Sequence, residues 1–134
     1  MIRYTKEFVA NVQGELIAKF DTDASGRPIA NVEEGTTFYF ITLSLHTQKS
    51  DDIRKVTYLL DSATFWEPER VSQAKQQEFQ ERITSYGDFL VRVVVALPTG
   101  DVMQQALLSD MLEAGHPQTR DAAIQGAIDA IRAN

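Results

Sequence analysis

Hydrophobic and polar positions alternate along the first part of the chain. Over residues 8–20 every even position is apolar or glycine, and most of the odd positions are polar. A period of two predicts a half-buried antiparallel strand, bent or bulged near Gly14. The Asp, Ser, Gly and Pro residues of 21–28 predict a loop. Its spacing is similar to a calcium-binding loop, but residue 32 is Val where a Glu ligand is needed, so we interpret it as a plain turn.

Three further strands are predicted. Residues 38–45 are apolar at nearly every position, which predicts a strand buried on both faces. Residues 53–60 have apolar residues on one face, and 89–97 alternate strongly, so each predicts a strand. We expect Pro68 to end any β-ladder. The polar stretch 72–82 is interpreted as a solvated loop or a frayed helix that runs into a short strand at 79–84.

Beyond a turn predicted at 98–101 the hydrophobic period changes. Five residues at helical spacing favour a helix over 102–114: Met103, Ala106, Leu107, Met111 and Ala114. The alternative is a final strand at 102–108 that pairs with 89–97. A last helix is predicted after Pro117, capped by Thr119 and with Asp121 in its first turn. Its apolar stripe consists of Ile124, Ala127, Ile128 and Ile131.

Many strands followed by one or two helices predict a mainly β protein, a sandwich with C-terminal helices. The 134 residues suit one hydrophobic core. We therefore expect a sandwich over 1–100 and a helical extension over 101–134 that packs on the same domain. The helical stripe at 124–131 is interpreted as packed on the sandwich, and homo-oligomerisation through the C-terminal helices is the alternative.

Composition narrows the class of protein further. No apolar run approaches the roughly 20 residues of a transmembrane helix, and the first residues lack the pattern of a signal peptide. Zero cysteines exclude disulfides and thiolate chemistry. The net charge of −6, without a basic stripe, argues against direct binding of nucleic acid. We expect a soluble, cytoplasmic protein.

The sequence contains no recognisable catalytic motif. His46 and His116 lie in different predicted loops, where exposed turn residues are the simpler interpretation, and their spacing is poor for a metal site. A nucleophile elbow and a phosphate-binding glycine loop are both absent from the sequence. A Ser/His/Asp triad assembled from distant residues stays open. We therefore expect no catalytic residues, no metal and no cofactor, and we favour a binding module over an enzyme.

Four segments, in order, carry a resemblance to a known family. They are 38–43 (FYFITL), 53–61 (IRKVTYLLD), 64–68 (TFWEP) and 85–89 (SYGDF). Together they resemble the YEATS domain, most closely its prokaryotic branch, over about residues 10–100. The resemblance implies an immunoglobulin-like sandwich with a ligand site at one end. The sequence has Asp61 where the family has a histidine, and Ser85 where it has a glycine.

The resemblance also implies a ligand and the residues that bind it. An acylated lysine would lie between the aromatic walls Phe65 and Tyr86, with the Thr64 hydroxyl orienting its amide. The backbone of Tyr86 or Gly87 would donate a hydrogen bond, and Trp66 and Ser85 complete the predicted ligand-binding set. A flat amide stacks favourably between aromatic rings, whereas an ammonium loses hydration there.

Each of these residues also has a structural interpretation. Phe65 would plug the core, Tyr86 would be a corner tyrosine bonded to its own backbone, and Thr64 would bond its loop, while Trp66 is the best candidate for exposure. The leading functional hypothesis is a bacterial, signalling-type recognition module that binds a protein or peptide partner. The alternative is an assembly protein that uses the sandwich and the C-terminal helices as its interface.

Overall fold

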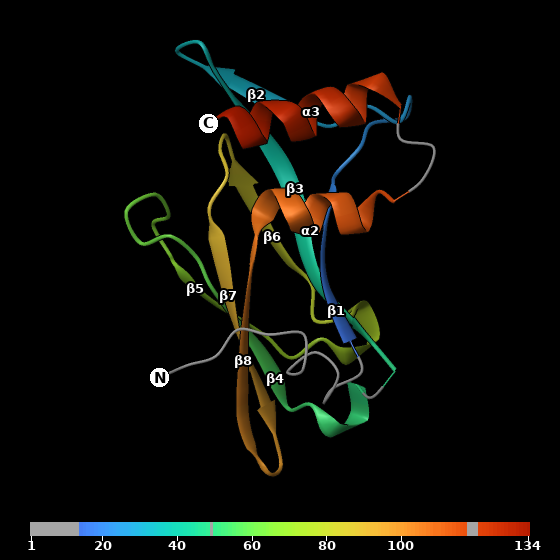
Figure 1. Ribbon diagram of the computed structural model, residues 1–134, viewed down its shortest axis with the longest axis vertical. Coiled ribbons are helices and arrows are strands. Elements are labelled where there is room, and N and C mark those ends of the chain that lie inside the picture. Colours follow the sequence, from blue (N-terminus) through green and yellow to red (C-terminus); the bar gives the residue numbers. More distant parts are fainter. Residues whose placement is uncertain (1–13, 49, 118–120) are drawn as a thin grey trace.

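The computed structural model describes residues 14–48, 50–117 and 121–134, and in them two antiparallel sheets face each other (Figure 1). The first sheet contains β1 (Gly14–Phe20), β2 (Ala30–Glu33), β3 (Thr36–Thr47) and β6 (Glu81–Ser85). The second sheet has the order β5 (Glu69–Ser72), β4 (Lys55–Leu59), β7 (Leu90–Leu97) and β8 (Gly100–Leu107). The predicted mainly β sandwich is confirmed.

The chain crosses between the two sheets several times. The β3–β4 connection contains the short 3-10 helix η1 (Ser50–Asp52), and the β5–β6 connection contains η2 (Lys75–Gln77). The β6–β7 connection returns the chain to the second sheet. Such crossings between antiparallel sheets are the way an immunoglobulin-like sandwich is built, so this part of the fold prediction is also confirmed.

The core lies between the sheets and follows the alternation in the sequence. Leu16, Ala18 and Phe20 point inward from β1, as their period of two predicts. In β3 the prediction of burial on both faces is wrong. Ile41, Leu43 and Leu45 are buried, but the residues between them are only half-buried, because the described residues cover the outer face of this sheet incompletely.

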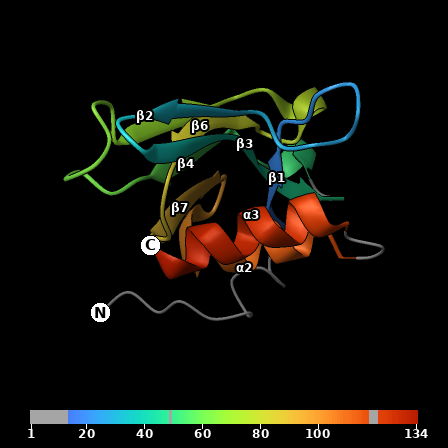
Figure 2. The same cartoon turned by 90° about the horizontal axis from the view of Figure 1, so that it is seen from above.

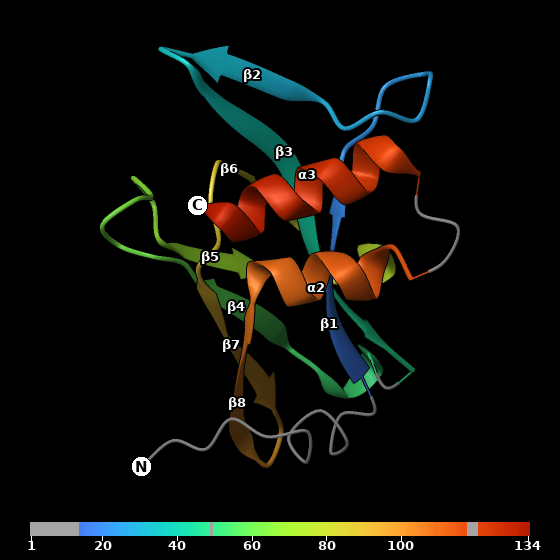
Figure 3. The same ribbon diagram turned by 45° about the horizontal axis from the view of Figure 1, so that its top comes forward.

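Two helices close one open side of the sandwich. Helix α2 (Leu108–Gly115) follows β8 directly and packs on β1, so it spans the edges of the two sheets. Helix α3 (Ala122–Ala133) lies beside it, on the same side of the molecule (Figures 2 and 3). None of the described helices is long and apolar enough to cross a membrane.

The apolar stripe of α3 is buried in the common core, with each of its residues at most 7% exposed. The stripe therefore packs inside the molecule, as predicted, and is not a free surface. The Asp121 side chain caps α3 by accepting a hydrogen bond of 2.9 Å from the Ile124 N–H. Asp121 is thus the cap itself and not a residue of the first turn. The predicted cap, Thr119, lies outside the described residues.

Two strands differ from the sequence prediction. Residues 100–107 form β8, paired along their length with β7, so the favoured helix over 102–114 is wrong up to Leu107 and the alternative strand is correct. Strand β5 was not predicted, since it begins directly after Pro68 and is short and polar. Pro68 does not end the ladder, because its carbonyl accepts a hydrogen bond of 2.7 Å from the Leu60 N–H. The short strand predicted at 79–84 is present as β6.

The β5–β6 connection is held to the core by a buried tyrosine. The Tyr58 hydroxyl donates a hydrogen bond of 2.8 Å to the Phe79 carbonyl, and both side chains are fully buried. Glu78 and Phe79 have φ angles of 55° and 54°, a left-handed conformation that side chains seldom adopt. Burial is the main cause that raises the pKa of Tyr58, so the hydroxyl keeps its proton and stays a donor.

Candidate functional site

The β4–β5 and β6–β7 loops meet at one end of the sandwich. Between them lies a small cleft of about 100 Å³, lined by Asp61, Thr64, Ser85, Tyr86, Gly87, Asp88, Phe89 and Asn134. Of the predicted ligand-binding residues, Thr64, Ser85, Tyr86 and Gly87 are therefore brought together, and Phe65 and Trp66 do not line this cleft. The predicted ligand-binding set did not include Asp61, Asp88, Phe89 or Asn134.

Asp61 organises the first loop. Its carboxylate accepts hydrogen bonds from the Ala63 N–H at 3.2 Å and from the Thr64 hydroxyl at 2.7 Å, and its carbonyl accepts from the N–H groups of Thr64 and Phe65. This Asx-turn satisfies the loop backbone locally. Because the Thr64 hydroxyl donates its proton to Asp61, its oxygen can only accept a further hydrogen bond.

At the β6–β7 loop, Ser85 and Gly87 make contacts that stabilise the fold. Ser85 is buried, donates to the Gly87 carbonyl at 2.8 Å and accepts weakly from the Gly87 N–H at 3.4 Å. A Cβ at Gly87 would lie 2.9 Å from the Asn134 carbonyl oxygen, so glycine is needed for the end of the chain to pack there. Ser85 and Gly87 therefore support the cleft, and the predicted role of the Gly87 N–H as a donor to a ligand is not favoured.

Asp88 connects the second loop to α2. Its carboxylate accepts hydrogen bonds from the Ser109 N–H at 2.9 Å and the Ser109 hydroxyl at 2.6 Å, at the start of that helix. The N-cap residue of α2, Leu107, has no side chain that could accept these hydrogen bonds. Asp88 thus caps α2 from another part of the chain, and the positive end of the helix compensates its charge.

Of the two aromatic walls that the resemblance implies, Tyr86 lines the cleft and Phe65 does not. Tyr86 is 41% exposed and its ring contacts Phe38 edge to face, with centroids 5.5 Å apart. Phe65 is half-buried and packs on Phe89, with centroids 5.1 Å apart. Phe89 therefore lines the cleft, with Phe65 packed against it, in agreement with the structural interpretation of Phe65.

Trp66 is 97% exposed, as the sequence predicted. It follows Phe65 in the β4–β5 loop, which projects from the sandwich in Figure 1. Water-exposed tryptophan side chains are uncommon because the indole presents a large apolar area. Because Trp66 does not line the cleft, a role in the cleft does not explain its exposure.

The two histidines lie outside the cleft. His46 pairs with Glu78 at 2.5 Å, and both side chains are well exposed. His116 is not the exposed turn residue that was expected: its ring stacks on Phe20, and its Nε2 accepts a hydrogen bond of 3.2 Å from the Phe20 N–H. In the described part of the chain, His, Asp and Glu side chains form no group of three that could hold a metal ion.

Comparisons with known proteins give a structural similarity only. No protein-family model matches the sequence, and no curated protein matches it. A solved structure described as the Yaf9 YEATS domain recognising an H3K122suc peptide is similar, with a TM-score of 0.48 and 18% identity over 72% of this chain and 71% of that chain. The yeast AF-9 homolog protein Yaf9 is similar with a TM-score of 0.47 and 19% identity, over 71% of this chain and 66% of that one. YEATS domains are thus among the structures that this sandwich resembles.

Proposed function

We propose that this chain is a non-enzymatic recognition module that binds a peptide side chain in the cleft between the β4–β5 and β6–β7 loops. The observation that carries this proposal is that two loops about twenty residues apart form one cleft with an exposed tyrosine ring and a threonine oxygen. Both loops are fixed by their own hydrogen bonds, so the cleft is formed before a ligand arrives.

The cleft suits the tip of a side chain rather than a whole ligand. Its volume of about 100 Å³ is equivalent to roughly three water molecules at about 30 Å³ each. The Thr64 oxygen can accept a hydrogen bond from an N–H group, and the exposed Tyr86 ring offers a face for stacking. An amide group has the size, the flat shape and the N–H that these features require.

We therefore propose the amide of an acylated lysine as the group that is bound. The two carboxylates at the cleft already accept hydrogen bonds from neutral donors, in the first loop and at the start of α2. An ammonium would lose hydration on entering a cleft of this size, whereas a neutral amide loses less. Acetylated lysine should thus bind more tightly than unmodified lysine.

Calorimetric titration with matched peptides containing acetylated or unmodified lysine tests this proposal. Thr64→Val keeps the size of the side chain and removes the accepting oxygen, so it should weaken binding of the acetylated peptide about tenfold, the usual order for one good hydrogen bond. Tyr86→Ala should weaken it by a similar factor through loss of stacking.

Thr99→Val provides the matched control. Thr99 is exposed in the β7–β8 turn, at the opposite end of the sandwich from the cleft (Figure 1), and its replacement should leave binding unchanged. Equal affinity for acetylated and unmodified peptides would contradict the choice of amide. Binding that survives both cleft substitutions would contradict the site.

A further inference from the structure

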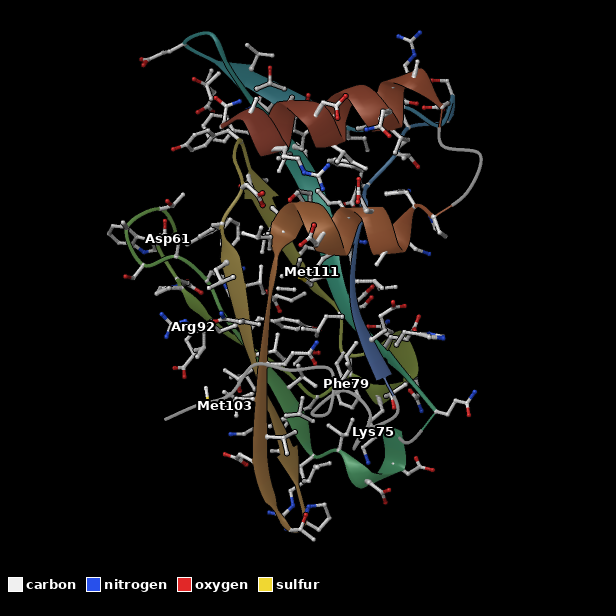
Figure 4. All side chains as sticks on the ribbon, viewed as in Figure 1. Asp61, Lys75, Phe79, Arg92, Met103 and Met111 are labelled. Carbon is white, nitrogen blue, oxygen red and sulfur yellow. The ribbon has the colours of Figure 1, made fainter. Side chains whose placement is uncertain are left out.

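A second, larger groove lies on the other side of the Asp61 turn. It has a volume of about 350 Å³, within the range of ligand pockets, and shares Asp61 and Phe89 with the cleft. Its other lining residues come from the end of β4, from Ser62 and from the outward-facing positions of β7. Asp61 and Arg92 mark its two sides in Figure 4.

Leucine side chains line the groove together with the polar residues Asp61, Ser62 and Arg92. Leu59 and Leu90 line it, and Leu90 is 40% exposed. Leu107, the β8 neighbour of Leu90, extends this apolar surface and is 42% exposed. Arg92 is exposed, and no described residue forms an ion pair with it. The guanidinium of Arg92 can stack over an aromatic ring and can pair with an acidic group that enters the groove beside it.

The β4–β5 loop carries both of these partners. Trp66 offers the aromatic ring, and Glu67, which follows it, is exposed and offers the acidic group. The volume of about 350 Å³ is near the lower end of the range for ligand pockets, so the groove suits one aromatic side chain. The same loop contributes Asp61 and Ser62 to the groove, so Trp66 and the groove lie at the same end of the molecule.

We propose that the chain forms a two-fold symmetric dimer in which Trp66 of each copy enters the groove of the other. Arg92 lies over the indole, and Glu67 of the entering loop pairs with Arg92. Both contacts are related by the two-fold axis, so the interface is isologous and the assembly closes at two copies. Leu90 and Leu107 are buried at the rim of this interface.

The single tryptophan reports the contact directly. On raising the protein concentration from about 1 μM to about 1 mM, the range of weak affinities, the emission of Trp66 should shift to the blue as the indole leaves water. Sedimentation equilibrium should show the mass doubling over the same range. Emission that remains that of an exposed tryptophan, with a constant monomer mass, would overturn the proposal and leave a peptide or another protein as the occupant of the groove.

Complementation of two variants gives the sharper test. Trp66→Ala and Arg92→Ala each replace an exposed side chain, and each should weaken dimerisation at least about tenfold, as loss of an interface anchor does. In an equimolar mixture, Trp66 of the Arg92→Ala chain meets an intact groove on the Trp66→Ala chain, so one complete contact returns. The mixture should therefore dimerise more strongly than either variant alone, with a blue shift from the only tryptophan present.

Two variants away from the groove serve as controls. One removes a positive charge, as Arg92→Ala does, and the other removes an exposed apolar side chain, as Trp66→Ala does. Arg54→Ala removes an exposed arginine just before β4, and Val32→Ala removes an exposed apolar side chain from β2, both away from the groove. Both should dimerise like the unmodified chain. A dimer that Trp66→Ala leaves intact, or a mixture that fails to restore association, would overturn the proposed contact.

Discussion

The carboxylate of Asp88 caps α2 by accepting hydrogen bonds from both the backbone N–H and the hydroxyl of Ser109, 21 residues further along the chain. The loop that borders the cleft and the start of the helix that closes the sandwich are therefore one structural unit. Stability and the shape of the cleft depend on the same side chain.

Replacing Asp88 with alanine should destabilise the protein by about 1–2 kcal/mol, because two donors at the start of α2 lose their acceptor. The free energy of unfolding in urea measures this change. Asp101→Ala, at an exposed position of β8, should change it by less than about 0.5 kcal/mol. Equal effects of the two substitutions would contradict the capping role of Asp88.

The same glycine-to-alanine change should have opposite effects in the two C-terminal helices. At Gly115 a Cβ would lie 2.0 Å from the Ala18 carbonyl oxygen, so α2 would have to move off β1 at a cost of about 1–3 kcal/mol. At Gly126, exposed in α3, nothing lies within 4 Å of the new Cβ, and alanine should stabilise the helix by about 0.5–1 kcal/mol. Thermal unfolding of both variants checks the two signs, and a stabilised Gly115→Ala would show that α2 is not seated on β1 as described.

Tyr58→Phe should destabilise the protein by about 1–3 kcal/mol, because the buried Phe79 carbonyl loses its donor. Burial raises the pKa of Tyr58, so the unfolded chain releases this proton first and stability should fall above about pH 10. The phenylalanine variant should lack this part of the alkaline loss. Tyr39→Phe, at a half-buried position in β3, is the control and should retain both the stability and its alkaline decline in urea titrations.

Asp23 should titrate below its ordinary pKa of 3.8 in the folded protein. Its carboxylate accepts a hydrogen bond from the Ser25 hydroxyl and others from the Arg27 and Ser25 N–H groups, which lower the pKa. A lowered pKa means that the contribution to stability is present above the unfolded value and is lost as the pH falls through the folded one. The Asp23 side-chain carbon signal in NMR gives the midpoint, and Ser25→Ala should raise it; an unchanged midpoint in that variant would contradict the role of the hydroxyl.

The sequence predicted those parts of the fold that depend on local periodicity. The alternating residues of β1 and β7 correspond to the buried faces of these strands. The apolar stripe of α3 likewise corresponds to the buried face of that helix. The change from strand to helix at Leu107 was hidden, because Ala106, Leu107 and Met111 have helical spacing and neither glycine nor proline separates the two elements. Strand β5 is paired with β4 through its backbone, so its polar side chains gave no signal.

For the candidate site, the sequence located the two loops but not the contacts that shape them. Gly87 and Asp88 depend on partners 47 and 21 residues away, just after α3 and at the start of α2, and the sequence pattern does not give the positions of these helices. The alternation predicts Phe89 as the first residue of a strand, whereas in the structure Phe89 lines the cleft and its ring packs on Phe65. Asp61 departs from the family pattern that the sequence resembles, and in the structure its carboxylate orders its own loop.

The contact between Gly87 and Asn134 places the exit of the polypeptide at the rim of the cleft. A tag fused after Asn134 would emerge next to the proposed binding site. The same proximity is useful to an experimenter, since a fluorophore attached at this position would sense whether the cleft is occupied without altering a residue of either loop.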